Sequence, residues 1–166
     1  MNQLLLVNDS GLYCPQGDFY IDPWKPVDNA IITHVHPDHA RIGHRNYLVH
    51  QDSEGLLKYQ LGSYLQCQKL KYGEKITRNG VSITLYPAGH IPGSAQVKLD
   101  YNGQTWVFTS DFKLLSDGIS GTYEPIKTDV LVTEGTFGLP LFFFFSQNKV
   151  FDQINDWWAY NAENHK

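Results

Sequence analysis

The sequence predicts an α/β domain, because short apolar runs that suit strands are separated by tight-turn signals and by segments of helical periodicity. Four runs rich in apolar and β-branched residues are typical of buried strands: 30–33, 81–86, 105–109 and 129–133. Asn79-Gly80 and Asn102-Gly103 are dipeptides that favour two-residue hairpin turns. We therefore expect one hairpin over 75–86 and a second that ends in the strand at 105–109.

Two segments predict helices. In 53–61, we expect Leu56, Leu57 and Leu61 to share one face. Ser146 suits the N-cap of a second helix. The apolar stripe of this second helix consists of Val150, Phe151, Ile154, Trp157 and Trp158. Both patterns are typical of amphipathic helices.

Composition sets bounds on the class of protein. The chain has 166 residues, which fits one domain, and its net charge of −4 gives no global signal of nucleic-acid binding. Cys14 and Cys67 match no zinc-finger spacing, so we expect two reduced thiols in a cytosolic protein. The most apolar runs, 4–7 and 141–145, are far shorter than the roughly 18 residues that span a bilayer. With no signal peptide either, we expect a cytoplasmic location and no membrane partner.

The segment 33–40 reads Thr-His-Val-His-Pro-Asp-His-Ala, a dense group of metal-binding side chains. His34 and His36 are two residues apart at the end of a predicted strand, so their imidazoles face the same side and can bind one ion. The proline that follows favours a turn, which directs Asp38 and His39 towards a second ion. The alternative is a polar strand end whose histidines cap loops and bind no metal.

Two downstream loops carry further ligand candidates. The glycine-rich segment 87–94 follows a predicted strand and contains His90. Asp111, in Ser-Asp-Phe at 110–112, follows the strand at 105–109. Alone, either side chain would be an ordinary loop residue. Together with the histidine segment, they complete a candidate metal site.

The order and spacing of these motifs resemble the metallo-β-lactamase superfamily. The chain carries His-x-His-x-Asp-His at 34–39, Gly-His-x-x-Gly-Ser at 89–94 and Ser-Asp-Phe at 110–112. Glu-Gly-Thr-Phe-Gly at 134–138 resembles the acidic motif of the β-CASP branch, whose members cut nucleic acid. Three further segments resemble the bacterial ligase-associated DNA exonucleases: 11–15, 18–24 and 136–140.

The resemblance implies a four-layer αββα sandwich built from two similar halves. A chain of this length covers the first half and the start of the β-CASP region, so we expect an incomplete sandwich with an exposed sheet edge or face. On this basis, residues 1–140 form the metal-binding domain. Residues 141–166 form a truncated amphipathic helix at the start of the β-CASP region.

The resemblance also implies ligands for two metal ions, which we expect to be zinc, with manganese as a second candidate. The first ion takes three imidazoles, the second takes a carboxylate and an imidazole, and one further carboxylate bridges both ions. In that order, these ligands are His34, His36 and His90, then Asp38 and His39, then Asp111.

Other positions are implied to act beside the ligands. Asp22 and Ser94 would hold the ligands in position without binding the metal themselves. The alternative for Asp22 is a simple turn, because an aspartate before a proline is a common turn signal. The residues implied in catalysis are Asp38, Asp111 and Glu134, of which Glu134 would orient a general-acid histidine. Taken alone, Glu134 is better explained as a solvated strand end.

The chain also departs from the family pattern. After Asp111, its only histidine is His165, which lies in no matching motif. The second metal therefore lacks an expected fourth protein ligand, and Glu134 has no general-acid histidine to orient. Since loss of even a supporting partner costs about 10- to 100-fold in affinity, we expect a complete first metal site and a weak second one.

These motifs predict a metal-dependent phosphodiester hydrolase. Two zinc ions about 3.5 to 4 Å apart would lower the pKa of a bridging water to about 7 and neutralise the phosphate. The subgroup resemblance implies a DNA exonuclease that repairs DNA beside an ATP-dependent DNA ligase and a helicase. Arg41 and Arg45 would contact phosphates, although ordinary surface charges explain them equally well. Two alternatives stay open: a hydrolase of thioesters or lactones, and a truncated zinc-binding remnant without catalysis.

Overall fold

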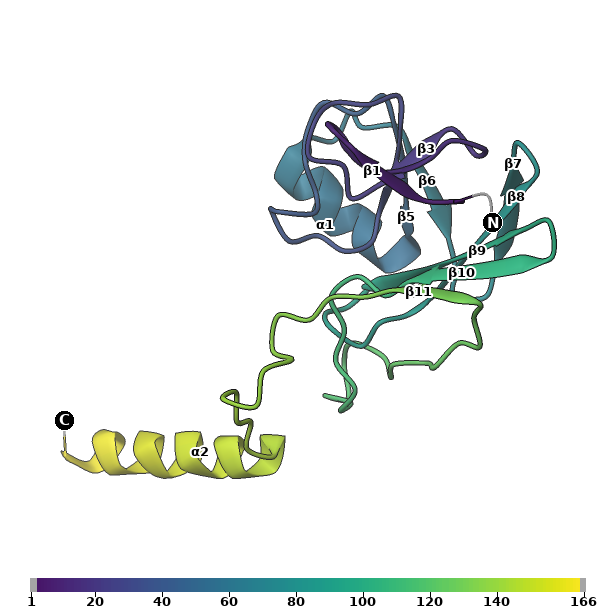
Figure 1. Cartoon of the computed structure of the whole chain (residues 1–166). Coiled ribbons are helices and arrows are strands. Elements are labelled where there is room, and N and C mark those ends of the chain that lie inside the picture. The colour runs from purple at the N-terminus through teal and green to yellow at the C-terminus, as the bar shows by residue number, and fades with distance from the viewer. Residues whose placement is uncertain (1–2, 165–166) are drawn as a thin grey trace. The chain divides into compact units, whose positions relative to one another are not determined.

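The computed structural model describes residues 3–164, so His165 lies outside the described part of the chain (Figure 1). The chain forms two compact units, Met1–Glu134 and Gly135–Lys166. Among the described residues, the strands and one helix belong to the first unit, and a single helix belongs to the second.

The first unit is built around two β-sheets. One sheet has six strands in chain order and runs parallel from β3 to β6. Its strands are β1 (Leu6–Asn8), β2 (Gly11–Cys14), β3 (Phe19–Ile21), β4 (Asn29–Ile32), β5 (Asn46–His50) and β6 (Cys67–Leu70). The other sheet has five strands in the order β11-β10-β9-β8-β7. Its strands are β7 (Lys75–Arg78), β8 (Val81–Pro87), β9 (Ala95–Tyr101), β10 (Gln104–Phe108) and β11 (Val130–Val132).

Both predicted hairpins are present in the second sheet. β7 turns into β8 through Asn79 and Gly80, with φ of 48° and 83°. β9 turns into β10 through Asn102 and Gly103, with φ of 49° and 76°. Two successive positive φ values define the type I′ turn, which matches the twist of the flanking strands. The turn chemistry predicted from the sequence therefore sets the register within two strand pairs, β7 with β8 and β9 with β10.

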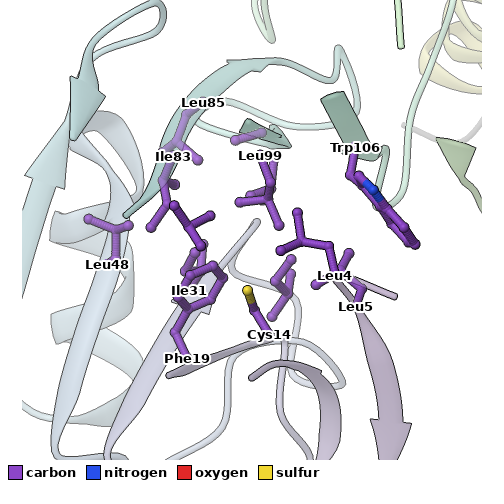
Figure 2. Close-up of a cluster of buried hydrophobic side chains, with 14 of the residues drawn as sticks. Leu4, Leu5, Cys14, Phe19, Ile31, Leu48, Ile83, Leu85, Leu99 and Trp106 are labelled. Atoms are coloured by element: carbon purple, nitrogen blue, oxygen red, sulfur yellow. The ribbon is translucent and has the colours of Figure 1, made fainter. Parts of the chain in front are cut away.

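Apolar side chains fill the space between the two sheets (Figure 2). Phe19 of the first sheet belongs to the same buried cluster as Ile83 and Leu99 of the second. A second cluster lies on the other face of the first sheet, where helix α1 (Gln51–Leu61) contributes the fully buried Leu57. Helix, sheet and sheet thus form successive layers, as expected for the predicted α/β sandwich.

An irregular segment, rather than a helix, crosses the outer face of the second sheet within residues 3–134. Gln96 of β9 is fully buried there, and its side-chain amide donates to the carbonyls of Pro87 and Glu124 at 2.9 and 2.8 Å. The backbone N–H of Lys113 donates to the carbonyl of Ala88 at 3.0 Å. These bonds tie the connection from β10 to the parallel strand β11 onto the sheet.

Helix α1 differs from its prediction in two respects. It begins at Gln51, where His50 acts as the N-cap and its Nδ1 accepts a hydrogen bond from the backbone of Asp52 at 3.3 Å. Leu56 is 45% exposed, whereas Leu57 is fully buried. Adjacent helical residues point about 100° apart, and of these two leucines Leu57 faces the sheet while Leu56 faces solvent. The prediction of a shared face was wrong for Leu56.

In the second unit, helix α2 (Gln147–Asn164) begins directly after Ser146, the predicted N-cap. The hydroxyl of Ser146 accepts a hydrogen bond from the backbone of Lys149 at 3.4 Å. No described residue of α2 is buried. Before the helix, the ring of Phe137 meets the rings of two other phenylalanines edge-on. Neither described helix has the length and apolar character needed to cross a membrane.

We expect Leu57→Ala to lower the free energy of unfolding by about 2 to 5 kcal/mol, because it empties a fully buried position between α1 and the first sheet. Leu56→Ala on the same helix is the matched control and should change stability by less than about 0.5 kcal/mol. Urea denaturation followed by circular dichroism measures both. Equal losses in the two variants would contradict the orientation of α1.

Candidate metal centre

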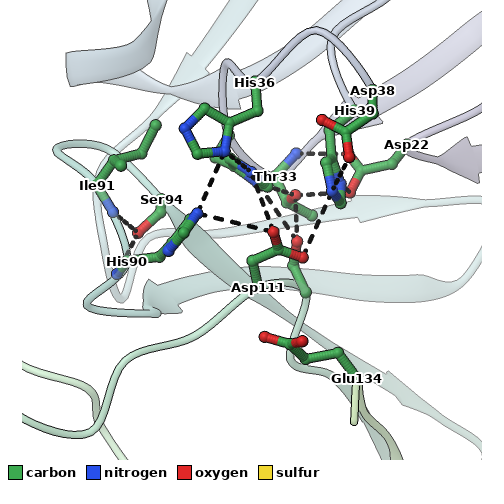
Figure 3. Close-up of polar contacts among 12 residues, drawn as sticks. Asp22, Thr33, His36, Asp38, His39, His90, Ile91, Ser94, Asp111 and Glu134 are labelled. Atoms are coloured by element: carbon green, nitrogen blue, oxygen red, sulfur yellow. Dashed lines mark hydrogen bonds and ion pairs between the residues drawn. The ribbon is translucent and has the colours of Figure 1, made fainter. Parts of the chain in front are cut away.

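The candidate metal centre lies where strands of both sheets end (Figure 3). The histidine segment follows β4 of the first sheet, while His90 follows β8 and Asp111 follows β10 of the second. Beside the site, the backbone N–H of Ala95 on β9 donates to the carbonyl of Thr33 at 2.9 Å, which joins the two sheets. Packing of the sheets therefore brings together side chains that are far apart in sequence.

One atom from each of four side chains converges on a single point. These residues are His34, His36, His90 and Asp111, and their candidate ligand atoms all lie within 4.8 Å of one another. Nδ1 of His36 lies 3.0 Å from Nε2 of His34 and 3.2 Å from Nε2 of His90. Three imidazole nitrogens and one carboxylate oxygen are a donor set that suits a divalent transition ion.

The carboxylate of Asp111 faces a second group of side chains as well. Its Oδ2 lies 3.7 Å from Nε2 of both His34 and His90, while its Oδ1 lies 3.4 Å from Nε2 of His39. The same Nε2 of His39 is 3.5 Å from the carboxylate of Asp38, whose side chain is 73% exposed. The second group is therefore smaller and more open to solvent than the first.

Asp22 lies behind this second group. Its Oδ2 is 2.8 Å from Nδ1 of His39, and its Oδ1 accepts a hydrogen bond from the backbone of Thr33 at 2.8 Å. Asp22 has a φ of 44°, in the left-handed region that non-glycine residues seldom adopt. The backbone turn after β3 thus aims this carboxylate at the histidine segment.

Ser94 holds the loop that carries His90. Its buried hydroxyl accepts hydrogen bonds from the backbone N–H groups of His90 and Ile91 at 3.1 and 3.2 Å. The hydroxyl of Ser53, in the first turn of α1, donates to the carbonyl of Gly93 at 3.0 Å. Gly93 has a φ of 78°, and a Cβ there would lie 2.4 Å from the Ser53 hydroxyl, so only glycine fits. The loop is held from both sides.

The remaining predicted residues lie around the site without joining the convergent atoms. Glu134 accepts a hydrogen bond from the backbone of Phe112 at 3.3 Å, which anchors the residue next to Asp111. Arg41 is exposed and donates from Nε to the carbonyl of Asp38 at 3.3 Å. Arg45 is also exposed. Neither arginine belongs to the group of convergent atoms.

Burial shifts the protonation of the histidines. Burial and the neighbouring imidazoles lower the pKa of His34 to about 3, and burial likewise lowers the pKa of His90. For His39, burial lowers the pKa, but the hydrogen bond and charge of Asp22 together with the other carboxylates raise it above its usual value. His34 and His90 are therefore neutral at pH 7, and a neutral imidazole can donate a lone pair to a metal.

Sequence reasoning missed Thr33 and Ser110 as parts of the site. Their hydroxyl oxygens are 2.6 Å apart, and both lie close to Nδ1 of His34. The only signal is position, because each residue directly precedes a predicted ligand. Their contact spans 77 residues of sequence, which no local pattern reveals.

Comparison with known proteins supports the sequence motifs. No family model matches the chain. A probable DNA ligase of Opitutus terrae is 30% identical over 147 residues, which cover 87% of this chain and 14% of that protein. An RNase J-like protein of Methanocaldococcus jannaschii is 31% identical over 144 residues, covering 70% of this chain and 33% of that protein. The chain thus spans a third or less of these relatives.

Among solved structures, a metallo-β-lactamase of Cronobacter sakazakii with an HARLDQ motif has a TM-score of 0.51 and 15% sequence identity. The match covers 78% of this chain and 75% of that one, so the two share a fold. Fold and site together define a metallo-β-lactamase-type α/β protein with a candidate metal centre. The chain is thus similar in fold to a metallo-β-lactamase, and its relatives in sequence include proteins named as RNases, in agreement with the resemblance of its motifs.

We expect His36→Ala to abolish metal binding at the first group, because His36 Nδ1 lies next to both other imidazole nitrogens. Asp111→Ala should weaken binding at both groups, since its two oxygens face both. Each loss should be at least about 10- to 100-fold. Titration calorimetry with zinc measures the affinities, and Asp152→Ala on the exposed surface of α2 is the control. Unchanged zinc content in His36→Ala would refute the site.

We expect Ser94→Ala to lower zinc affinity by about 10-fold or more, because the His90 loop loses the acceptor of two backbone N–H groups. Competition with a chromophoric chelator measures the change. The control is Ser116→Ala, which removes a similar hydroxyl contact from an exposed turn. Wild-type affinity in Ser94→Ala would mean that the loop positions His90 without this hydroxyl.

Proposed function

We propose that the chain is the metal-binding part of a nuclease, a metal-dependent hydrolase of phosphodiester bonds. The observation that carries this proposal is the placement of the Asp111 carboxylate between the imidazoles of the first group and His39 of the second. A carboxylate with one oxygen towards each group suits a pair of adjacent cations, and such pairs serve in-line displacement at phosphorus. The nuclease names of several relatives support the same reaction class.

Charge explains why this reaction requires cations here. Asp38 and Asp111 lie beside the imidazoles and Asp22 lies behind them, so the residues alone place negative charge where an anionic phosphodiester would bind. Divalent ions held by these ligands would reverse the local charge and supply a hydroxide nucleophile at neutral pH. Asp38 and Asp111 are the carboxylates that we assign to catalysis. Glu134 is assigned a supporting role, since its bond to Phe112 holds the Asp111 loop.

The two groups should differ in affinity. The first group offers four convergent atoms, and His34 within it is fully buried. The second offers His39 with the exposed Asp38, and it shares Asp111 with the first. We assign zinc to the first group, because imidazole and carboxylate ligands suit it, and regard manganese as the alternative metal.

For the substrate, we propose DNA ends, processed by an exonuclease that acts in repair beside an ATP-dependent ligase and a helicase in the cytoplasm. The similarity to a probable DNA ligase over 87% of this chain supports the association with a DNA ligase within this proposal. RNA is the competing substrate, because other relatives are named as RNases. Arg41 is the side chain best placed to meet a phosphate, since it contacts the backbone of Asp38.

The test is a cleavage assay with the purified full chain and zinc or manganese. Labelled single-stranded DNA, 3′-ended duplex DNA and RNA of the same sequence are compared, with a thioester as the non-nucleic-acid substrate. We expect shortening of DNA from an end, lost by at least about 10- to 100-fold in Asp111→Ala. Asp152→Ala is again the control.

The other outcomes separate the alternatives. Cleavage of RNA alone would overturn the DNA assignment and keep the nuclease. Turnover of the thioester alone would replace the nuclease with a hydrolase of small esters. Bound metal without turnover of any substrate would favour a zinc-binding chain without catalysis.

A further inference from the structure

We propose that the hydroxyl of Thr33 is a relay that links Asp22 to His34 and holds the His34 ring with its proton on Nδ1 and its Nε2 lone pair towards the metal centre. Thr33 is thus assigned as a positioning residue. The inference rests on the proposed metal-dependent function, because it concerns how a ligand is prepared for metal.

The contacts around Thr33 are short and buried. Its Oγ1 lies 2.6 Å from Oδ2 of Asp22, 2.6 Å from Oγ of Ser110 and 3.2 Å from Nδ1 of His34. Thr33, Ser110 and His34 are each at most 2% exposed. Water therefore has little access to these groups, so the partner of each hydrogen-bond donor must be another of these side chains.

Counting donors fixes the direction of each bond. A carboxylate only accepts, so the single hydroxyl proton of Thr33 must go to Asp22. At 2.6 Å, Ser110 also needs a proton between its oxygen and that of Thr33, so Ser110 must donate its own. No hydroxyl proton then remains for His34. Nδ1 of His34 can therefore join this network only as the donor, and we assign it that role, which leaves Nε2 of the neutral ring free of hydrogen.

The carboxylate of Asp22 also orients His39, in this case by direct contact. Oδ2 of Asp22 lies 2.8 Å from Nδ1 of His39, which must also donate, so the neutral ring of His39 has its lone pair on Nε2, the atom that faces Asp111. Asp22 therefore sets His39 directly and His34 through Thr33. One residue behind the site thus prepares one imidazole in each of the two groups, as outer hydrogen bonds commonly do for metal ligands.

The decisive variant is Thr33→Val, which keeps the branched shape and removes the hydroxyl. Thr33→Ser restores the hydroxyl without the methyl group. Thr109→Val is the matched control, because Thr109 is equally buried and its hydroxyl contacts Ser110 O and Thr133 rather than a histidine. All variants are made in the full chain.

Two readouts are needed. Long-range ¹H–¹⁵N correlation spectra of the chelator-treated protein report which ring nitrogen of His34 carries the proton. Competition titration with zinc reports affinity. We expect the Nδ1–H form of His34 in the wild type, in Thr33→Ser and in Thr109→Val. Thr33→Val should show a mixture of tautomers and about 10- to 100-fold weaker zinc binding, most of which Thr33→Ser recovers.

The outcomes distinguish this inference from the proposed function. A wild type that binds no zinc would overturn the proposed function, whereas the tautomer spectra would still test the relay. Zinc binding with an unchanged His34 tautomer in Thr33→Val would overturn the relay alone. So would an equal affinity loss in Thr33→Val and Thr109→Val, because it would indicate a general effect of losing a buried hydroxyl.

Discussion

The packing of the two sheets against each other is the constraint on which the candidate metal centre depends. The histidine segment leaves one sheet, and His90 and Asp111 leave the other. Their ligand atoms meet within 4.8 Å only if the two sheets keep their relative position. The apolar cluster between the sheets and the hydrogen bond between Ala95 and Thr33 hold the sheets in this relative position. The geometry of the candidate metal centre therefore depends on the packing of the core.

Backbone strain is concentrated where the site needs it. Asp22 and Ser110 adopt φ values of 44° and 53°, a left-handed conformation that costs an L-residue about 1 to 2 kcal/mol. Both side chains make short bonds to Thr33, so the surrounding contacts offset that cost. Strained residues that persist because their neighbours hold them are characteristic of functional sites.

Local features of the sequence predicted much of the fold and part of the site. The two Asn-Gly hairpins and the Ser146 cap were correct because turns and caps are determined by neighbouring residues. The shared face of α1 was wrong for Leu56, since periodicity alone does not say which side of a short helix meets the sheet. The Thr33–Ser110 contact could not be foreseen, because it depends on how two distant strand ends meet.

Because the ligands come from both sheets, a bound metal ion would also affect the stability of the folded protein. An ion coordinated by residues of both sheets would link the two sheets. The unfolded chain has no preformed site of this kind, so it would bind the ion more weakly. Metal binding would then raise the free energy of unfolding. Metal supply during synthesis would govern how much intact protein accumulates, and scarcity would leave this end of the sandwich open to proteases.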